Sequence, residues 1–554
     1  MDPLGASCYS LHKIDPSTGP SYDRKRDENL TEVTASTKSL SFYDNKTFKS
    51  LLPQIFATLL ASSFHITVGI SLAYSAVLVP QLESPESNVK VTVTESSWIA
   101  SCVALVVPLG SIGSGFLMDR IGRLNTIKLA AIPNSIGWAI IALATNAPML
   151  LIGRLLTGFA GAVGTAPIIV YVTEIARPDM RGALLCTCPL CAALGMVITY
   201  LQGWISNWRI VAWSCIIYTI VPILCLWFIY ESPVWLISKG KHERAKKSLE
   251  WFHKYQNKNP EQNFAHIQLS ILQKEHKIKL EQEQQEKRRG GAAQMLKKFS
   301  RPTGYKPLII LLGLFFVQQF SGIYVTLFYA VTFFQAVGSD INPYMASVLI
   351  GAVRFLMSIV NTVLLKRFRK RILMMISCCG MAVCMFVSGL FTQRIHKGTT
   401  THTWVPVVAL LMYVVTSMIG LMAIPWTMTA EMFPLDIRGV AHSITIGIAN
   451  VLMFAAVQSY RSLDVTLGGA HAVQYFYGVV CLTGLIYVYI FVPETYGKKL
   501  SEIEEYFNNN TIYLTHKLRV KNEAKKAKKQ KNSKIREVIE NNDNNEQCEK
   551  MIPA

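Results

Sequence analysis

Residues 308–334 read LIILLGLFFVQQFSGIYVTLFYAVTFF and contain no charged side chain. A helix needs about 20 residues to cross the hydrocarbon core of a bilayer, so this stretch is long enough to span one. Charged residues make up only 16% of the chain and apolar residues 51%. A soluble domain usually carries about a quarter charged residues. The sequence therefore predicts a membrane protein.

We expect eleven other spans of the same kind, six before a long polar loop and five after the stretch just quoted. They lie at 55–78, 97–117, 129–144, 150–172, 184–201 and 210–230, and at 344–365, 372–390, 405–428, 444–460 and 476–492. The span at 129–144 is short for a bilayer.

The polar segments divide these spans into two groups of six. The expected organisation is a cytoplasmic N-terminal tail (1–50), a six-helix bundle (51–238), a cytoplasmic loop with short helices (239–306), a second six-helix bundle (307–497) and a basic cytoplasmic tail (498–554).

The net charge of +20 raises the question of nucleic-acid binding. Its distribution argues against that function, because the positive charges gather in the tails, the central loop and the loops expected on the same side. Positively charged segments stay in the cytoplasm during insertion. We therefore expect a multi-pass protein in the lipid bilayer, with both termini cytoplasmic and no nucleic-acid partner.

Enzymatic or metal chemistry finds no support in the sequence. No nucleophile–base set or nucleotide signature is present, and most of the 12 cysteines fall inside expected spans. Small buried thiols of this kind pack between helices. We expect no catalytic residue, no metal site and no cofactor.

An internal repeat relates the two groups of spans. Glu174 precedes Arg181 and Gly182 in the first group, and Glu431 precedes Arg438 and Gly439 at the same spacing in the second. Duplication of a six-span unit explains this match. A transporter of two halves, with its site near the middle of the bilayer, is the expected architecture.

Charged residues recur where the spans end on the cytoplasmic side. Arginine grips a carboxylate at two points, so these residues can hold helix ends together. We expect Glu174 and Glu231 to pair with Arg123 and Arg181. The full set of expected gating charges is Asp119, Arg120, Arg123, Glu174, Arg181, Glu231, Glu431, Arg438 and Glu494.

Five motifs in order resemble the sugar porter family of the major facilitator superfamily, over residues 51–504. They read GFLMDRIGR at 115–123, ESPVWL at 231–236, QQFSGI at 318–323, PW at 425–426 followed by EMFP at 431–434, and PETYGK at 493–498. The segment VGISLAY at 68–74 is similar to the first span of insect facilitative trehalose and glucose transporters.

The resemblance implies an all-α membrane protein of twelve helices in two pseudo-symmetric bundles, the major facilitator fold. It also implies a monomeric sugar uniporter of the plasma membrane, for a hexose or a disaccharide such as trehalose, that works by alternating access. Proton-coupled members carry an aspartate in the first span after a glycine, whereas this chain has Gly69, Ile70 and Ser71. We therefore expect transport without proton coupling.

The resemblance further implies a sugar site on the fifth, seventh, eighth, tenth and eleventh spans. Amides both donate and accept hydrogen bonds, as sugar hydroxyls require. We carry over Gln318, Gln319 and Trp426 as sugar contacts. Other positions depart from the family pattern. The expected substrate-binding set therefore also contains Tyr324, Arg354 and Asn450.

The sequence leaves two roles open for Arg354. An arginine inside an apolar span is energetically costly unless it faces a wet cavity or a partner. It can contact the substrate or make a structural pair. The alternative functions are transport of another solute, for example an anionic one that contacts Arg354, and a nutrient sensor that transports nothing.

Overall fold

The computed structural model describes residues 48–255, 264–288, 297–434, 436–498, 500–509 and 513. The regular elements in these residues are all helices. Contacts divide the chain into two compact units. The linker unit comprises Met1–Ile55 and Tyr230–Arg289, and the bundle unit comprises Phe56–Ile229 and Gly290–Ala554. The two expected terminal tails lie almost wholly outside the described residues.

The first half of the bundle unit holds the helices that precede the polar loop. They are α2 (Phe48–Ser62, which begins in the linker unit), α3 (Phe64–Glu83), α4 (Val93–Ile121), α5 (Arg123–Ala142), α6 (Ala147–Ile175), α7 (Arg181–Leu185), α8 (Thr187–Ile205) and α9 (Trp208–Cys225), with the short turn η1 (Leu226–Phe228).

The second half holds the helices that follow the loop. They are α14 (Pro302–Phe320), α15 (Val325–Phe328), α16 (Ala330–Val337), α17 (Pro343–Arg367), α18 (Lys370–His396), α19 (Val405–Ile419), α20 (Ile424–Glu431), α21 (Arg438–Leu467), α22 (Ala470–Ile490) and α23 (Leu500–Asn509).

Eleven stretches of the described chain are long and apolar enough to cross a membrane. The helix α5 is not among them, because polar side chains such as Asn125, Lys128 and Asn134 lower its hydropathy. It nevertheless lies against α6 and α9, as a member of the same bundle. Together these helices agree with the twelve spans expected from the sequence.

The same neighbour relations recur in both halves. In the first half α3 contacts α8, α4 contacts α6, and α5 contacts α6 and α9. In the second half α14 contacts α21, α17 contacts α19, and α18 contacts α19 and α22. Each pair in the first half has its counterpart six spans later. The repeated charges in the sequence therefore reflect a repeated three-dimensional unit.

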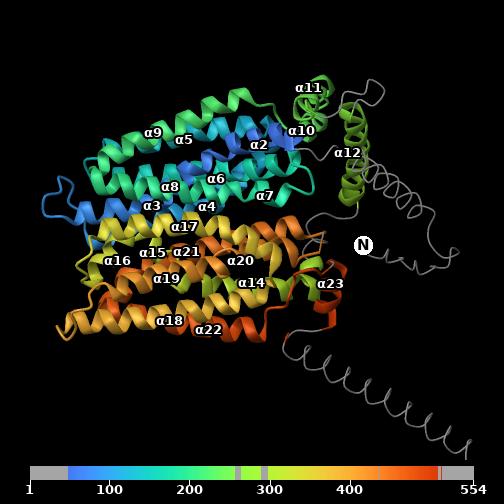
Figure 1. Cartoon of the computed structure of the whole chain (residues 1–554). Coiled ribbons are helices and arrows are strands. Elements are labelled where there is room, and N and C mark those ends of the chain that lie inside the picture. The colour runs from blue at the N-terminus through green and yellow to red at the C-terminus, as the bar shows by residue number, and fades with distance from the viewer. Residues whose placement is uncertain are drawn as a thin grey trace, which may run out of the picture. The chain divides into compact units, whose positions relative to one another are not determined.

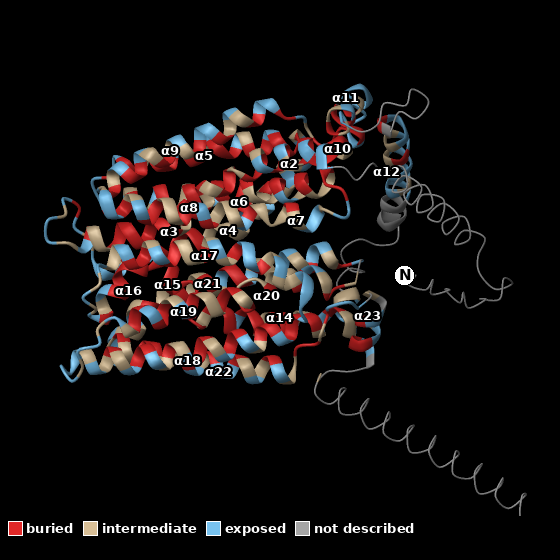
Figure 2. Cartoon of the chain, viewed as in Figure 1, coloured by how far each residue is buried: buried red, intermediate tan, exposed pale blue. Residues whose placement is uncertain are grey.

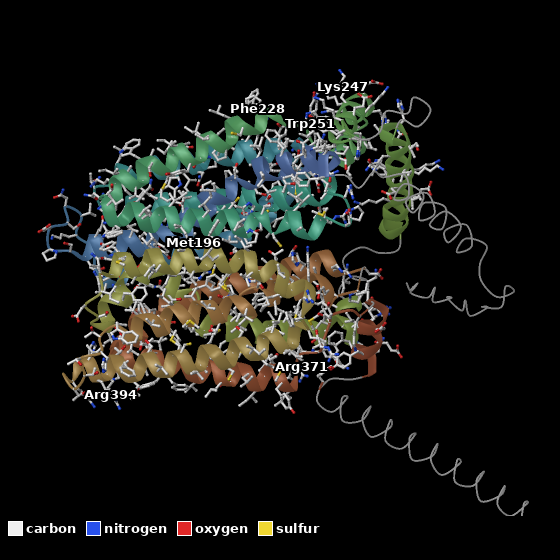
Figure 3. The ribbon with its side chains drawn as sticks, viewed as in Figure 1. Met196, Phe228, Lys247, Trp251, Arg371 and Arg394 are labelled. Carbon is white, nitrogen blue, oxygen red and sulfur yellow. The ribbon has the colours of Figure 1, made fainter. Side chains whose placement is uncertain are left out.

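The two halves lie side by side within the bundle unit (Figure 1). They meet where α4 contacts α21, where α8 contacts α17, and where α3 contacts α15 and α16. Met196 on α8 belongs to a buried apolar cluster that draws most of its members from the second half (Figure 3). The first two contacts are equivalent under the repeat, so the interface itself is pseudo-symmetric.

Large apolar side chains remain exposed along the outer helices, among them Ile112 at 73%, Ile217 at 61% and Val363 at 61%. Exposed positions run along the helices of both halves (Figure 2). Soluble proteins rarely expose apolar surface on this scale, whereas a lipid-facing surface requires it.

The linker unit contains three helices, α10 (Pro233–Ser238), α11 (His242–Phe252) and α12 (Phe264–Arg288). Ala245, Leu249 and Phe252 recur at helical spacing, and all three are buried on one face of α11. Trp235 on α10 lies in the same small apolar core as Ala245.

Two glycines let α3 and α8 touch backbone to backbone. A Cβ atom on Gly69 would lie 1.9 Å from the carbonyl oxygen of Ala192, and one on Gly195 would lie 2.1 Å from that of Ile66. Small residues allow such close crossings of membrane helices. Neither contact leaves room for any side chain.

We predict that Gly195→Ala destabilises the protein by about 1–3 kcal/mol, because the new methyl group pushes the two helices apart. The melting temperature of the detergent-purified chain measures the effect. Gly113→Ala on α4 is the matched control, since a Cβ there would meet nothing within 4 Å. Equal melting temperatures for the two variants would contradict the close contact.

Candidate functional site

The span expected at 308–334 is broken in its middle. The helix α14 ends at Phe320, and α15 begins only at Val325. Gly322 lies between them with φ +92°, a conformation that suits glycine because it has no Cβ. The carbonyl oxygens of Gly322 and Tyr324 still accept from the N–H groups of Thr326 and Phe328, each at 2.9 Å, whereas that of Ser321 is bound from another helix.

Tyrosine side chains from other helices bind two carbonyl oxygens, one at this break and one in α15 just after it. The Tyr413 hydroxyl donates to the carbonyl oxygen of Ser321 at 2.8 Å, and the Tyr200 hydroxyl donates to that of Leu327 at 2.9 Å. Neither tyrosine was among the residues expected from the sequence.

The span expected at 405–428 is also broken, between α19 and α20. Pro425 stands at the start of α20, where its missing N–H costs no helical hydrogen bond. The side-chain amide of Gln318 donates to the carbonyl oxygens of Leu421 at 2.6 Å and Met422 at 3.0 Å. The Ser377 hydroxyl accepts from the Leu421 N–H at 3.0 Å. These bonds satisfy the backbone at the second break.

Breaks of this kind have a functional meaning in membrane proteins. Irregular backbone at membrane depth occurs only where it is buried in protein or lines a cavity. Discontinuous helices also form the binding sites of many transporters. The two breaks are linked by Gln318, so they mark one candidate site in the second half.

Three of the expected substrate residues gather at these breaks. Gln318 and Gln319 are fully buried, and Gln319 donates to the Oε1 atom of Gln318 at 3.2 Å. The Oε1 atom of Gln319 is buried and has no hydrogen-bond partner among the described residues. Trp426 is half-buried and packs edge-on against Phe315, with ring centroids 4.9 Å apart. Gln319 thus keeps an acceptor oxygen available, whereas Gln318 uses its donors on the backbone.

Tyr324 lies in the first break, whereas the side-chain hydrogen bond of Asn450 stays within its own helix α21. Tyr324 is buried at the first break, with the Trp426 side chain near its hydroxyl. Asn450 on α21 is buried and donates to the Ile446 carbonyl oxygen of its own helix at 2.9 Å.

Arg354 on α17 is buried, with 3% of its surface exposed. One N–H group approaches the sulfur of Met422 at 3.8 Å. The tyrosines at 200, 324 and 413 lie close enough to influence it electrostatically. No carboxylate pairs with it within the part of the chain that the structure describes. A carboxylate partner, one of the surroundings expected for Arg354, is therefore absent among the described residues, and its contact with substrate stays a prediction.

A second buried arginine, Arg154 on α6, was missed by the sequence reasoning. Its guanidinium donates to the carbonyl oxygens of Ser71 at 2.8 Å and Ile99 at 3.3 Å, and to the Ser75 hydroxyl at 2.5 Å. The signal was present, since a charged residue interrupts the apolar stretch at 150–172.

One end of the bundle unit, where α4 ends and α5 begins, collects the expected gating charges; we name it the basic end. There Arg123 binds both oxygens of Glu174, at 2.8 and 3.1 Å. Lys370, the first residue of α18, binds Glu431 at the end of α20. Arg123 likewise begins α5, so the two ion pairs occupy equivalent places in the two halves.

The remaining gating candidates behave differently. Asp119 contacts Arg123 at 3.3 Å, and Arg120 lies over the ring of Phe116. Glu494 accepts the backbone N–H groups of Lys370 and Arg371, each at 3.2 Å. It thus caps the start of α18.

Like Arg120, the expected gating residues Arg181 and Arg438 form no ion pair within the described residues. Arg181 is exposed, and Arg438 donates instead to the Phe433 carbonyl oxygen at 3.3 Å. Glu231 belongs to the linker unit, where its Oε1 atom accepts from the Ser232 N–H at 3.0 Å.

At the end of the bundle unit opposite the basic end, an ion pair joins the two halves. Arg461 on α21 binds both oxygens of Glu83 at the end of α3, at 2.5 and 2.6 Å. Deeper in the interface, the Ser101 hydroxyl on α4 donates to the Gln458 side chain on α21 at 2.6 Å. Figure 3 shows the two ends through Arg371 and Arg394, which lie at the basic and opposite ends of α18.

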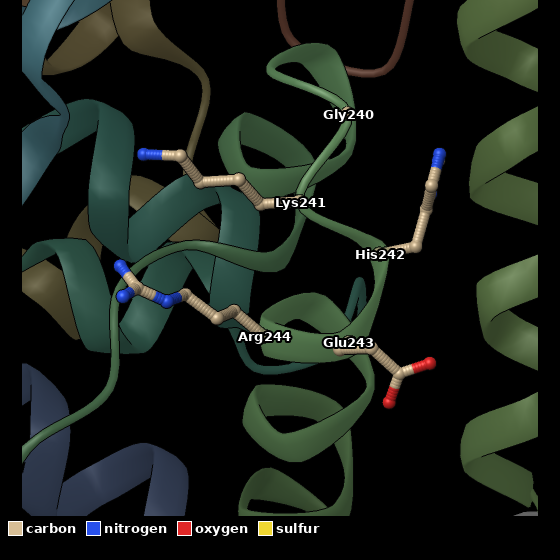
Figure 4. A pocket seen from close by; sticks show the side chains of 5 residues that line it. All are labelled: Gly240, Lys241, His242, Glu243 and Arg244. Atoms are coloured by element: carbon tan, nitrogen blue, oxygen red, sulfur yellow. The ribbon is translucent and has the colours of Figure 1, made fainter.

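An open pocket also lies in the linker unit, where α10 gives way to α11 (Figure 4). Its lining is Gly240, Lys241, His242, Glu243 and Arg244. It contains none of the expected substrate residues, so we place the candidate site at the helix breaks. No cluster of three or more potential metal-binding side chains occurs within the described ranges.

Comparison with known proteins gives a consistent result. The family described as "Sugar (and other) transporter" matches residues 48–507. The "Facilitated trehalose transporter Tret1" of Polypedilum vanderplanki is 32% identical over 81% of this chain and 87% of its own length. The same-named protein of Culex quinquefasciatus is 32% identical over 82% and 86%.

Solved structures with the same fold include the xylose transporter XylE from E. coli in a partially occluded inward-open conformation. The TM-score is 0.62 at 20% identity, and the alignment covers 80% of this chain and 99% of XylE. The inward-open conformation of XylE gives a TM-score of 0.61, also at 20% identity, over 82% and 98%. At this identity the likeness concerns the fold alone.

We predict that Glu174→Gln lowers the stability of the chain by about 2–3 kcal/mol, because Arg123 loses a two-point ionic contact that is largely shielded from water. Thermal unfolding of the purified chain measures the loss. Asp119→Asn is the control, since its side chain is 73% exposed and an exposed pair contributes about 1 kcal/mol or less. A larger loss in the control would show that the buried pair is unimportant.

We predict that Arg461→Glu loosens the end opposite the basic end, because it places two carboxylates together. A cysteine introduced by Ser101→Cys should then react about threefold to tenfold faster with a polar maleimide. The exchange Glu83→Arg with Arg461→Glu should restore slow labelling, since the pair is re-formed. Equal rates in the single variant and the exchange would rule out a link at this position.

Proposed function

This chain belongs to the family of sugar (and other) transporters, and from that membership we propose that it is a facilitative sugar uniporter working by alternating access. The expected fold, all-α with two pseudo-symmetric six-helix bundles, is confirmed by the fold of its structural neighbours. The chain is a multi-pass membrane protein of a transporter family rather than an enzyme.

The observation that carries the proposal is the pair of broken helices in the second half. A central transport site needs polar groups at membrane depth, and the breaks bring backbone carbonyls, Gln319 and Trp426 together. An indole offers a flat face for the C–H surface of a sugar and one N–H donor. The unpartnered Oε1 atom of Gln319 can accept from a sugar hydroxyl after a small side-chain movement.

We propose two kinds of role for the expected residues. We assign sugar contacts to Gln319, Trp426, Tyr324, Asn450 and Arg354. We assign a positioning role to Gln318, because both of its amide hydrogen bonds go to the broken backbone of α19 and α20.

Alternating access agrees with the distribution of ion pairs. Glu83 and Arg461 join the halves at one end, whereas Arg123–Glu174 and Lys370–Glu431 each join helices of one half at the basic end. This conformation corresponds to a carrier that is closed at the end held by Glu83 and Arg461. Since positive loops stay inside, we infer that the basic end and both termini face the cytoplasm. We further propose a monomer in the plasma membrane.

We base uniport, rather than proton-coupled transport, on the residues of the first span. Ser71 stands where a coupling carboxylate is expected in proton-driven relatives, and its backbone carbonyl accepts from Arg154. A carboxylate is the usual proton carrier within a membrane. The trehalose transporters among the relatives favour a sugar over the alternatives of an unrelated solute or a silent sensor.

We predict saturable uptake of a labelled sugar from a panel of trehalose, glucose and fructose in oocytes that express the chain. Uptake should stop at equal concentrations and survive collapse of the pH gradient. Trp426→Ala should lower uptake about tenfold or more, because the sugar loses its flat apolar contact. Trp213→Ala is the matched control, since that tryptophan is 47% exposed on α9.

Two results would refute uniport. Accumulation of the sugar above its outside concentration would indicate a coupled mechanism. Absence of uptake by protein that is present at the surface would favour a sensor.

A further inference from the structure

The two buried arginines of the bundle unit differ in how their charges are satisfied. Arg154 is fully buried and donates to two carbonyl oxygens and one hydroxyl. These acceptors come from α3 and α4, which makes Arg154 a structural link within the first half. Its hydrogen bonds leave little capacity for a ligand.

Arg354 has no such set of acceptors. A guanidinium carries five N–H donors. Only one of them has a partner among the described residues, and that partner is the thioether sulfur of Met422 at 3.8 Å. Thioether sulfur is a weak acceptor. Most of the hydrogen-bonding capacity of Arg354 is therefore unused.

The nearby tyrosines do not replace a counter-ion. Tyr413 already donates its hydroxyl proton to the Ser321 carbonyl oxygen at the first break, and Tyr200 donates to that of Leu327 in α15. Their oxygen atoms can accept from the guanidinium, but they remain neutral. A buried cation without an anion costs several kcal/mol, so this site favours a ligand that brings negative charge.

Met422 places Arg354 at the candidate site itself. The residue whose sulfur meets the guanidinium also offers its carbonyl oxygen to Gln318, at the second break. Arg354 therefore lies beside the same broken backbone as Gln318 and its neighbour Gln319.

We propose that the sugar carried by this protein bears an acidic group, as a uronic acid does, and that Arg354 is the specificity-determining residue that binds it. This inference rests on the proposed function, because it assumes that the breaks form a sugar site. A carboxylate matches the planar fork of arginine at two points. The neutral parts of the sugar would contact Trp426 and Gln319.

Closure of the site around its ligand increases the preference for an acidic sugar over a neutral one. An open site can hydrate Arg354, whereas an occluded site removes that water. A bound carboxylate lowers the cost of occlusion, and a neutral sugar does so much less. A ligand shifts such a cycle only through its different affinities for the two states, so an acidic sugar is the cargo that promotes passage.

The test compares D-glucuronate with D-glucose, which share a ring and differ in the carboxylate. In oocytes that express the full chain, we expect D-glucuronate to be taken up at least tenfold more efficiently. Its uptake should also carry a current, because a uniporter moves one net negative charge with each acidic sugar. Arg354→Gln should reduce the preference for D-glucuronate about tenfold or more. Arg354→Lys should retain part of it.

The outcomes separate the two proposals. Equal or better uptake of D-glucose by the natural chain would overturn the acidic-sugar inference and leave the sugar uniporter intact. A preference for D-glucuronate that persists in Arg354→Gln would overturn the role of Arg354. No uptake of either sugar, or of trehalose, by chain present at the surface would overturn both proposals.

A binding measurement decides the case if Arg354→Gln does not reach the surface. Thermal unfolding of the purified natural chain with D-glucuronate or D-glucose reports ligand affinity directly. We expect stabilisation by D-glucuronate at concentrations about tenfold below those needed for D-glucose. The reverse order would overturn the inference.

Discussion

The backbone of a membrane helix must satisfy its own polar groups, because the hydrocarbon core offers no water. In the described residues, two spans of the second half are interrupted at 321–324 and at 420–423, and side chains from elsewhere bind part of the backbone there. Gln318 and Ser377 bind the second break, Tyr413 binds the first, and Tyr200 binds α15 just after it. The breaks place polar groups in the interior of the second half. The candidate site therefore exists because specific side chains support irregular backbone there.

The two halves repeat each other in helix contacts but not in detail. Arg123 holds Glu174 at two points, whereas Lys370 holds Glu431 as a single charge, with Thr495 donating to the other oxygen at 2.9 Å. Arginine has a rigid fork and lysine a compact charge, so the second link is less directional. The duplicated unit has thus kept its charge pairing while changing its geometry.

Much of this organisation could be predicted from the sequence. The length of the apolar stretches indicates the spans, and the matched positions of Glu174 and Glu431 indicate the repeat. Both acids indeed hold the first residue of a neighbouring helix. Such features depend on local composition and on order along the chain, which a single sequence displays.

Other features depend on contacts between distant residues and were missed. The spans at 308–334 and 405–428 look continuous, because a break is stable only when side chains elsewhere bind its backbone. Nothing in the sequence around Tyr200 or Tyr413 indicates that their hydroxyl groups bind backbone carbonyl groups of other helices. Gln318 was expected to touch sugar, yet its amide binds carbonyl groups more than 100 residues away along the chain.

The backbone contact of α3 with α8 at Gly69 and Gly195 restricts how this protein can change shape. Because the backbones of α3 and α8 touch, the two helices cannot slide past each other without a collision. They must therefore move as one rigid body. The second half instead contains two chain interruptions held by individually weak hydrogen bonds. Flexure during a transport cycle should therefore concentrate in α14–α16 and α19–α20, which makes the duplicated halves mechanically unequal.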